Sequence, residues 1–190
     1  LRFARTDAYG GAFTSAISGS GNVIVASGTL QPTATNTYTG TTSILGGGML
    51  LVSTTAGLPG WNTAGRYSVA TGGALAVTND IGDADVMAML GTGNFAANSQ
   101  IGFDTSLGDR AWAVALSGST GLLKIGANTL SLSTTNTYTG TTTVAGGTLA
   151  LGGVNRLPTA AAISLAGGTL DLGGFTQTTG SGVAFTRSSG

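Results

Sequence analysis

The chain has 190 residues, and its 7 Lys and Arg residues balance its 7 Asp and Glu residues, so charged residues make up only 7% of it. A neutral chain argues against a nucleic-acid-binding protein, which needs a basic face to meet phosphates. Hydrophobic residues make up 41%, which argues against disorder. No apolar run is long enough to cross a membrane as a helix. The composition therefore predicts a folded chain with no transmembrane helix.

Cysteine is absent, so the fold has to be stable without disulfides. No secretory signal peptide is visible, because Leu1-Arg2-Phe3-Ala4 leads straight into sequence rich in Gly and Thr. The chain also begins without Met. We expect it to be one segment of a larger protein.

The first recurring element is the segment Asn36-Thr37-Tyr38-Thr39-Gly40-Thr41-Thr42, which returns unchanged at residues 136–142. The correspondence extends on both sides, from Ile17-Ser18-Gly19-Ser20 against Leu116-Ser117-Gly118-Ser119 to Leu58-Pro59 against Leu157-Pro158. Self-similarity at a fixed period is typical of repeat architectures. We therefore expect one continuous repeat segment over residues 1–190, made of two units of about 100 residues, at about 1–95 and 96–190.

A smaller pattern, Gly-Gly-x-Leu-x-(Leu or Val), lies inside the large one. Glycine allows the positive φ of a tight corner, and the alternation that follows predicts a short strand with one apolar face. Asp171 falls on the opposite, solvated face of its strand. The pattern occurs at residues 47–52, 72–77, 146–151 and 167–172, at spacings of 25 and 21 residues within the two pairs.

Two stretches depart from this pattern. Residues 53–66, with Leu58-Pro59-Gly60, predict a loop that leaves the repeat. Residues 83–90 predict a short helical insertion, with Asp83 as its cap, Val86, Met89 and Leu90 on one face, and Gly91 as its stop.

A period of 21–25 residues with one-sided strands predicts an all-β fold, a parallel β-solenoid of about eight coils. A single coil buries about five apolar side chains at roughly 1.5–3 kcal/mol each. Ordering two dozen residues costs roughly 1–2 kcal/mol per residue. Coils therefore have to stack and share hydrogen bonds along the axis.

The stretch 116–151 carries a resemblance to a known family. It contains Gly121-Leu122-Leu123-Lys124-Ile125-Gly126, then Thr129-Leu130-Ser131-Leu132, then the repeated segment, then Gly146-Gly147-Thr148-Leu149. It resembles the passenger-associated transport repeat of bacterial autotransporters, and residues 17–52 look like a second, drifted copy. The resemblance implies a right-handed parallel β-helix exported across the outer membrane of a Gram-negative bacterium. A membrane translocator would lie beyond this segment.

An enzyme would have to rely on carboxylates, because His and Cys are absent. Asp80 and Asp104 are 24 residues apart, close to one coil, so a stacked acid pair is one hypothesis. The other is that the acids cap turns and keep corners soluble, which we favour. Asp80, Asp83 and Asp85 also suggest calcium, but they match no calcium-binding motif, and a helix cap is the preferred interpretation. The seven acids are Asp7, Asp80, Asp83, Asp85, Asp104, Asp109 and Asp171.

Alternating threonines at 37, 39 and 41, and at 137, 139, 141 and 143, would suit an array that binds ice or a regular glycan. Threonine also simply suits exposed strand faces, and this explanation is preferred. Asn36 and Asn136 are expected to turn corners with left-handed backbone geometry. Tyr38 and Tyr138 are candidates for sugar binding or, preferably, for covering a coil edge with the hydroxyl in water.

Aromatic residues are expected to pack in or against the core, with Trp112 in the place of Phe13 of the other copy. Isolated arginines are expected to be solvated. The aromatic residues are Trp61, Trp112, Phe13, Phe103 and Phe175, and the arginines are Arg66, Arg110 and Arg156.

We therefore expect an extracellular structural or adhesive segment on the bacterial outer surface, not an enzyme. We assign it no catalytic residue, cofactor or metal. Its expected partners are its own neighbouring repeats, further copies of itself and surface glycans, and it would meet a membrane only through a translocator outside this segment. Two alternatives stay open: a carbohydrate-active enzyme on the same scaffold, and an ice- or glycan-binding threonine module.

Overall fold

The computed structural model describes residues 1–4, 12–180 and 185–187. Asp7 therefore lies outside the described residues. The chain divides into two compact units, Leu1–Gln100 and Ile101–Gly190. In both units every strand pairing is parallel, as it must be when a chain winds in one direction. The fold is an all-β solenoid of about eight turns, as the repeat pattern predicted, and the described residues hold one short α-helix.

The N-terminal unit is built on β2 (Val23–Leu30), a long strand that pairs at its two ends with two different strands. Its first half pairs with β3 (Thr42–Ile44) and its second half with β4 (Gly48–Val52). The next turn repeats this arrangement with β5 (Tyr67–Val69) beside β3 and β6 (Ala74–Thr78) beside β4, while β1 (Arg2–Ala4) pairs with β2 on its other side. Each turn therefore adds one strand to each half of the solenoid.

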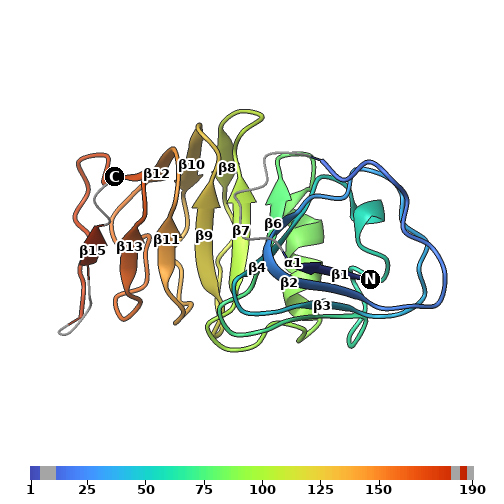
Figure 1. Cartoon of the computed structure of the whole chain (residues 1–190). Helices are drawn as coiled ribbons and strands as arrows, with labels where there is room; N and C mark the ends of the chain where they lie inside the picture. The colour runs from blue at the N-terminus through green and yellow to red at the C-terminus, as the bar shows by residue number, and fades with distance from the viewer. Residues whose placement is uncertain (5–11, 181–184, 188–190) are drawn as a thin grey trace. The chain divides into compact units, whose positions relative to one another are not determined.

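The C-terminal unit has two separate strand stacks, which are visible side by side in Figure 1. One stack runs β7 (Gln100–Asp104), β9 (Gly121–Ile125), β11 (Thr142–Val144), β13 (Ile163–Leu165) and β15 (Phe185–Arg187). The other runs β8 (Arg110–Trp112), β10 (Thr129–Leu132), β12 (Thr148–Leu151) and β14 (Thr169–Asp171).

Glycine doublets open the strands where the pattern predicted them, at the starts of β4, β6, β12 and β14. Gly72 has φ of 75°, which a residue with a Cβ rarely adopts. Its neighbour Gly73 lies against the preceding turn, where an added Cβ would come within 2.7 Å of the Leu45 carbonyl oxygen. One glycine of the doublet therefore makes the corner, and the other lets two turns approach.

The core is a set of apolar columns in which equivalent residues of successive turns stack in register. In the N-terminal unit Val25, Ile44 and Val69 form one column, and each is at most 1% exposed. In the C-terminal unit Leu130 pairs with Leu149, and Leu132 with Leu151. Leu170 and Leu172, expected on the inner face, are only partly covered, and Leu172 is 41% exposed. Asp171 is exposed, as predicted.

The two irregular stretches also appear. Residues 53–66 hold a short 3₁₀ turn, η1 (Thr55–Gly57), and Leu58 is fully buried. The helix α1 (Asp83–Gly91) buries Val86 and Met89. Its N-cap is Gly82, without a side-chain hydrogen bond, so the prediction that Asp83 caps it is wrong. Asp83 and Asp85 lie instead in the first turn, where carboxylates complement the helix dipole.

Candidate functional site

The repeated corner

Asn36 and Asn136 occupy the same place in the two copies and make the same contacts. The Asn36 side-chain oxygen accepts a hydrogen bond from Ile17 N at 2.8 Å, and its amide donates to Gly57 O at 2.8 Å. Asn136 accepts from Leu116 N at 2.8 Å and donates to Arg156 O at 2.7 Å. Each side chain thus joins the turn before it to the turn after it.

The expected left-handed geometry of these two residues is wrong. Among the described residues other than glycine, positive φ occurs at Asn98 and Asn155. Asn36 is 6% exposed and Asn136 is 2% exposed, so their side-chain amides form their hydrogen bonds inside the solenoid. Gln177 makes one of these hydrogen bonds again in the next turn, where its side-chain oxygen accepts from Leu157 N at 3.0 Å.

Tyr38 and Tyr138, two residues further on, are buried at 3% and 1% exposure. Their hydroxyls bond to Thr42 at 2.5 Å and to Thr142 at 2.6 Å. The preferred prediction of a hydroxyl in water is therefore wrong, and so is the sugar-binding alternative, because neither ring reaches the surface. Burial raises the pKa of both phenols, most strongly that of Tyr138. These buried hydrogen bonds give the corner a structural role.

Threonines and acids

The threonines of the repeated segment alternate with these buried residues and point outward. Thr37, Thr39 and Thr41 are exposed, as are Thr137 and Thr139. The preceding turn does not continue the array, because glycines stand where threonines would be needed. Thr39 N donates to Gly19 O, and Thr139 N donates to Gly118 O. The files of stacked threonines that an ice-binding face requires are missing at these positions.

Three of the carboxylates accept hydrogen bonds within their own turn, and Asp109 accepts one from the next turn. Asp80 accepts a hydrogen bond from the Thr78 hydroxyl at 3.2 Å, and Asp104 accepts from the Ser106 amide at 2.9 Å. Asp109 accepts from Thr129 N at 2.7 Å, and Asp171 accepts from Gly173 N at 2.8 Å. Asp80 and Asp104 belong to different units. Within residues 1–4, 12–180 and 185–187, no cluster of three or more potential acidic ligands is assembled for a metal ion.

The buried cations

Lys124, the only lysine of the chain, is 0% exposed. It sits on β9 in register with Val144 of β11, which pairs in turn with Leu165 of β13. Its ammonium donates to three backbone carbonyls: Ile125 O at 2.8 Å, Gly126 O at 2.9 Å and Gly146 O at 3.0 Å. An ammonium has three N–H donors, so all are satisfied.

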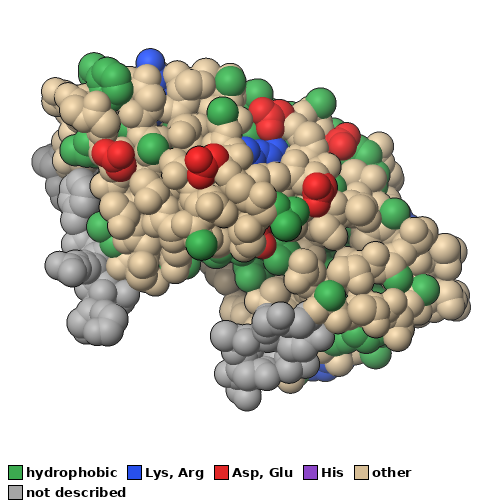
Figure 2. All heavy atoms as spheres, turned by 90° about the horizontal axis from the view of Figure 1, so that it is seen from above, with side chains coloured by type: hydrophobic (Ala, Val, Ile, Leu, Met, Phe, Trp, Pro, Cys, Tyr) green, Lys and Arg blue, Asp and Glu red, His purple; other side chains and the backbone are tan. Residues whose placement is uncertain are grey.

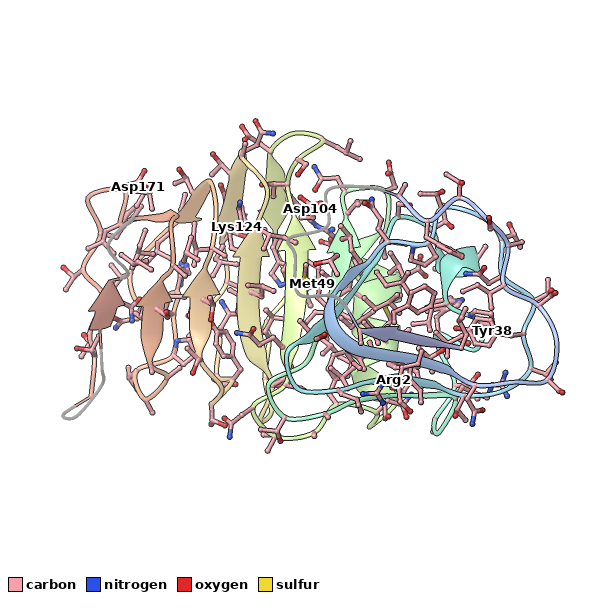
Figure 3. The ribbon with its side chains drawn as sticks, in the orientation of Figure 1. Arg2, Tyr38, Met49, Asp104, Lys124 and Asp171 are labelled. Atoms are coloured by element: carbon pink, nitrogen blue, oxygen red, sulfur yellow. The ribbon has the colours of Figure 1, made fainter. Side chains whose placement is uncertain are left out.

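Burial lowers the pKa of Lys124, and the charges of Asp104 and Asp109 oppose that shift. Lys124 and Asp104 lie near the same end of β9 and β7 (Figure 3). The alternation of Leu122 and Lys124 along one strand was the signal that the lysine points inward, and the sequence interpretation did not use it.

Arg110 is the second buried cation, at 8% exposure, so the prediction that it is solvated is wrong. Its guanidinium lies 5.0 Å from the ring centre of Phe103 and 5.4 Å from that of Trp112. These two rings pack at 4.8 Å and are fully buried, as predicted. Phe13 occupies the equivalent place to Trp112, pairing with Pro32 where Trp112 pairs with Leu132.

The other arginines and aromatics are only partly covered. Arg66 and Arg156 are half-buried and donate to Thr39 O at 2.6 Å and to the Thr135 hydroxyl at 3.1 Å. Trp61 and Phe13 are half-buried, and Phe175 is 41% exposed. Figure 2 shows few charged side chains on the face that it draws.

Comparison with known proteins

The Lys124 site and the Tyr138 corner both lie within residues 122–151. Residues 122–151 match the model of the passenger-associated-transport-repeat. The chain carries a passenger-associated transport repeat. The match begins one residue before Leu123-Lys124 and ends with β12, so it covers one full turn and the start of the next. This repeat and the β-solenoid fold fit a segment of an autotransporter passenger, and they point to a secreted or cell-surface protein.

No curated protein and no solved structure matches the chain. Among the described residues, no helix is long and apolar enough to cross a membrane.

Proposed function

We propose that the chain is a non-catalytic structural segment of an autotransporter passenger, displayed outside the cell. The observation that carries the proposal is the transport repeat at residues 122–151, set within turns that continue its strand stacks on both sides. Its conspicuous polar groups, Asn136, Tyr138 and Lys124, all bond to the solenoid itself. They stabilise the stack.

The fold suits display after export, because nearly every strand pairs with a strand one turn away. In such an array each turn needs only its neighbour, so folding can propagate from one end. The absence of cysteine also keeps disulfides from locking structure before export. Both points support a passenger, and neither requires catalysis.

The test is surface display. Residues 1–190 would be fused to the translocator of a characterised autotransporter, with an epitope tag at the N-terminus. We expect the tag on the cell surface and the passenger resistant to added protease. Leu149→Asp should leave the displayed passenger protease-sensitive, and Ala150→Asp should not. Retention of the wild-type chain in the periplasm would contradict the proposal.

Catalysis is tested separately with the purified chain and a panel of acidic and neutral polysaccharides. We expect no new reducing ends and no unsaturated products. Product formation that is lost in Asp104→Asn would instead establish the carbohydrate-active enzyme.

A further inference from the structure

The N-terminal unit carries an open groove that crosses three successive turns on its outer face. It has a volume of about 460 Å³, within the range of small-ligand sites. The first turn contributes Thr41 and Ser43, the second Ser68 and Ala70, and the third residues 93–96. Its lining consists of Thr41, Thr42, Ser43, Gly65, Tyr67, Ser68, Val69, Ala70, Gly93, Asn94, Phe95 and Ala96.

Small outward side chains in register create the groove. Ser43 of β3 pairs with Ser68 of β5, and Val69 bridges to Phe95 on the next turn. Toward the N-terminus the same outward file continues with Ile24 and then Arg2, which lie outside the groove. Arg2, labelled in Figure 3, lies on β1 in register with Ile24 of β2. The groove therefore begins where the outward residues become small.

Its walls are held in place by hydrogen bonds between turns. The Asn94 side chain accepts from Gly65 N at 2.8 Å and donates to Thr63 O at 3.0 Å. Beneath the groove, the buried Tyr67 hydroxyl donates to Met89 O at 2.9 Å, and its ring meets Phe95 edge to face at 6.2 Å. A site fixed in this way loses little conformational entropy when a ligand binds.

The chemistry of the lining selects the ligand class. No lining residue is charged, so the lining offers no oppositely charged side chain to an anion or a cation. The hydroxyls of Thr41, Ser43 and Ser68 form no side-chain hydrogen bond with any other described residue, so they remain available to a ligand. Phe95 adds a half-buried aromatic surface. Hydroxyl groups beside an aromatic ring match the polar edges and apolar faces of a sugar.

The geometry also disfavours an extended peptide. Strand β3 already pairs on both sides, with β2 and β5, and β5 bonds onward through Asn94 and Ala96. No free strand edge remains here for a peptide to add to the sheet. Successive turns lie about 4.8 Å apart, close to the length of one hexose along an extended glycan.

We propose that this groove binds an uncharged, linear hexose glycan, with one sugar ring over each of three turns. The groove needs neither export nor a translocator, so its test is independent of surface display. The probes are cellohexaose, laminarihexaose and maltohexaose, which are neutral, and an oligogalacturonate of six residues, which is anionic. Binding would be measured by titration calorimetry and by amide chemical shifts.

We expect at least one neutral hexasaccharide to bind and to shift the amides of Ser43, Ser68 and Phe95. Ser68→Tyr should fill the groove and weaken binding by about tenfold or more, which corresponds to at least about 1.4 kcal/mol. The matched control is Ser131→Tyr, which places the same side chain on the outward face of β10 in the other unit.

Ser68 is exposed on its strand and tyrosine suits strands, so the variant should fold, which circular dichroism would check. Three results would overturn the proposal: no neutral probe binds at millimolar concentration, Ser68→Tyr binds as well as the wild type, or the oligogalacturonate binds more tightly than every neutral probe.

Discussion

Lys124 shows how a charged side chain can be buried beside Val144 with no ion-pair partner in direct contact among the described residues. Its three N–H donors bond to Ile125 O and Gly126 O, at the corner between β9 and β10, and to Gly146 O, at the corner between β11 and β12. Of these carbonyls, Ile125 O also accepts from Thr105 N, at 3.1 Å. The ammonium is therefore the principal partner of Gly126 O and Gly146 O.

Lys124→Met keeps an unbranched side chain, one atom shorter, and removes the donors. We expect it to lower the free energy of unfolding by about 1–3 kcal/mol, because buried carbonyls lose their partner. Leu122→Met, on the same strand and equally buried, should cost less, under about 1.5 kcal/mol. Urea denaturation of both variants measures the difference. A Met variant at Lys124 that is as stable as the one at Leu122 would show that the carbonyls do not need the ammonium.

The pH dependence of stability follows from the lowered pKa of Lys124. The folded chain releases this proton at a lower pH than the unfolded chain does, so the unfolded state binds more protons between the two pKa values. The free energy of unfolding should therefore rise with pH through that window, up to about pH 10. Denaturation midpoints from about pH 7 to 10 should rise more in the wild type than in Lys124→Met. Parallel curves would contradict the assignment.

The buried tyrosines should lower the free energy of unfolding at higher pH. Burial raises the pKa of Tyr38, Tyr67 and Tyr138, so the unfolded chain releases their protons first. Stability should fall above about pH 10, and it should do so in both proteins.

A substitution at Asn136 tests how much the corner contributes to stability. Asn136→Ala removes bonds to the turns on either side and leaves Leu116 N without its acceptor. We expect a loss of about 1–3 kcal/mol in the free energy of unfolding. Asn62→Ala, at an exposed loop position, should change stability by less than about 0.5 kcal/mol. Thermal denaturation followed by circular dichroism compares the two, and equal losses would argue that the corner amide is dispensable.

Strand β12 shows how alternation sets the two faces of a single element. Leu149 is 0% exposed and pairs with Leu130 and Leu170, while Ala150 faces outward between Ser131 and Asp171. A one-residue slip of the strand would exchange these environments.

Leu149→Asp should therefore destabilise the chain by about 3–5 kcal/mol, because it buries a charge without a partner. Ala150→Asp should cost only about 0.2–1 kcal/mol, chiefly from repulsion by Asp171 across the strand pair. Ala150→Asn removes that repulsion and should lie closer to the wild type. Urea denaturation gives all three values, and similar losses at Leu149 and Ala150 would mean that the strand faces are assigned the wrong way round.

Across the whole molecule, stability is expected to be distributed among neighbouring turns, because strands pair with strands one turn away. Leu149→Asp should raise amide hydrogen exchange most in β12 and in β10 and β14, the two strands that pair with it. Protection in β2 and β4 of the N-terminal unit should change little. Exchange followed by mass spectrometry would show this, and an equal rise in both units would indicate a single cooperative block.

The parallel solenoid, the strand starts at the glycine doublets and the helix near residues 83–90 were all predictable. Each depends on a local and repeated signal: a positive-φ glycine, a period of two, or a helical spacing of apolar residues. The cap of α1 was not, because Gly82 and Asp83 are both acceptable there and packing decides between them. The position of Arg110 was missed because its aromatic partners come from two separate strands.

Sequence alone determined that this chain repeats, winds in parallel turns and buries leucine and valine on one face of each strand, because periodicity and glycine geometry are properties of the chain itself. Only the tertiary structure decided which groups the polar side chains bond to. Asn36, Asn136, Tyr138 and Lys124 turn inward because stacked turns bring carbonyls, amides and hydroxyls within reach of them. Those partners are supplied largely by other turns or by the folded corner, so no single local pattern shows them.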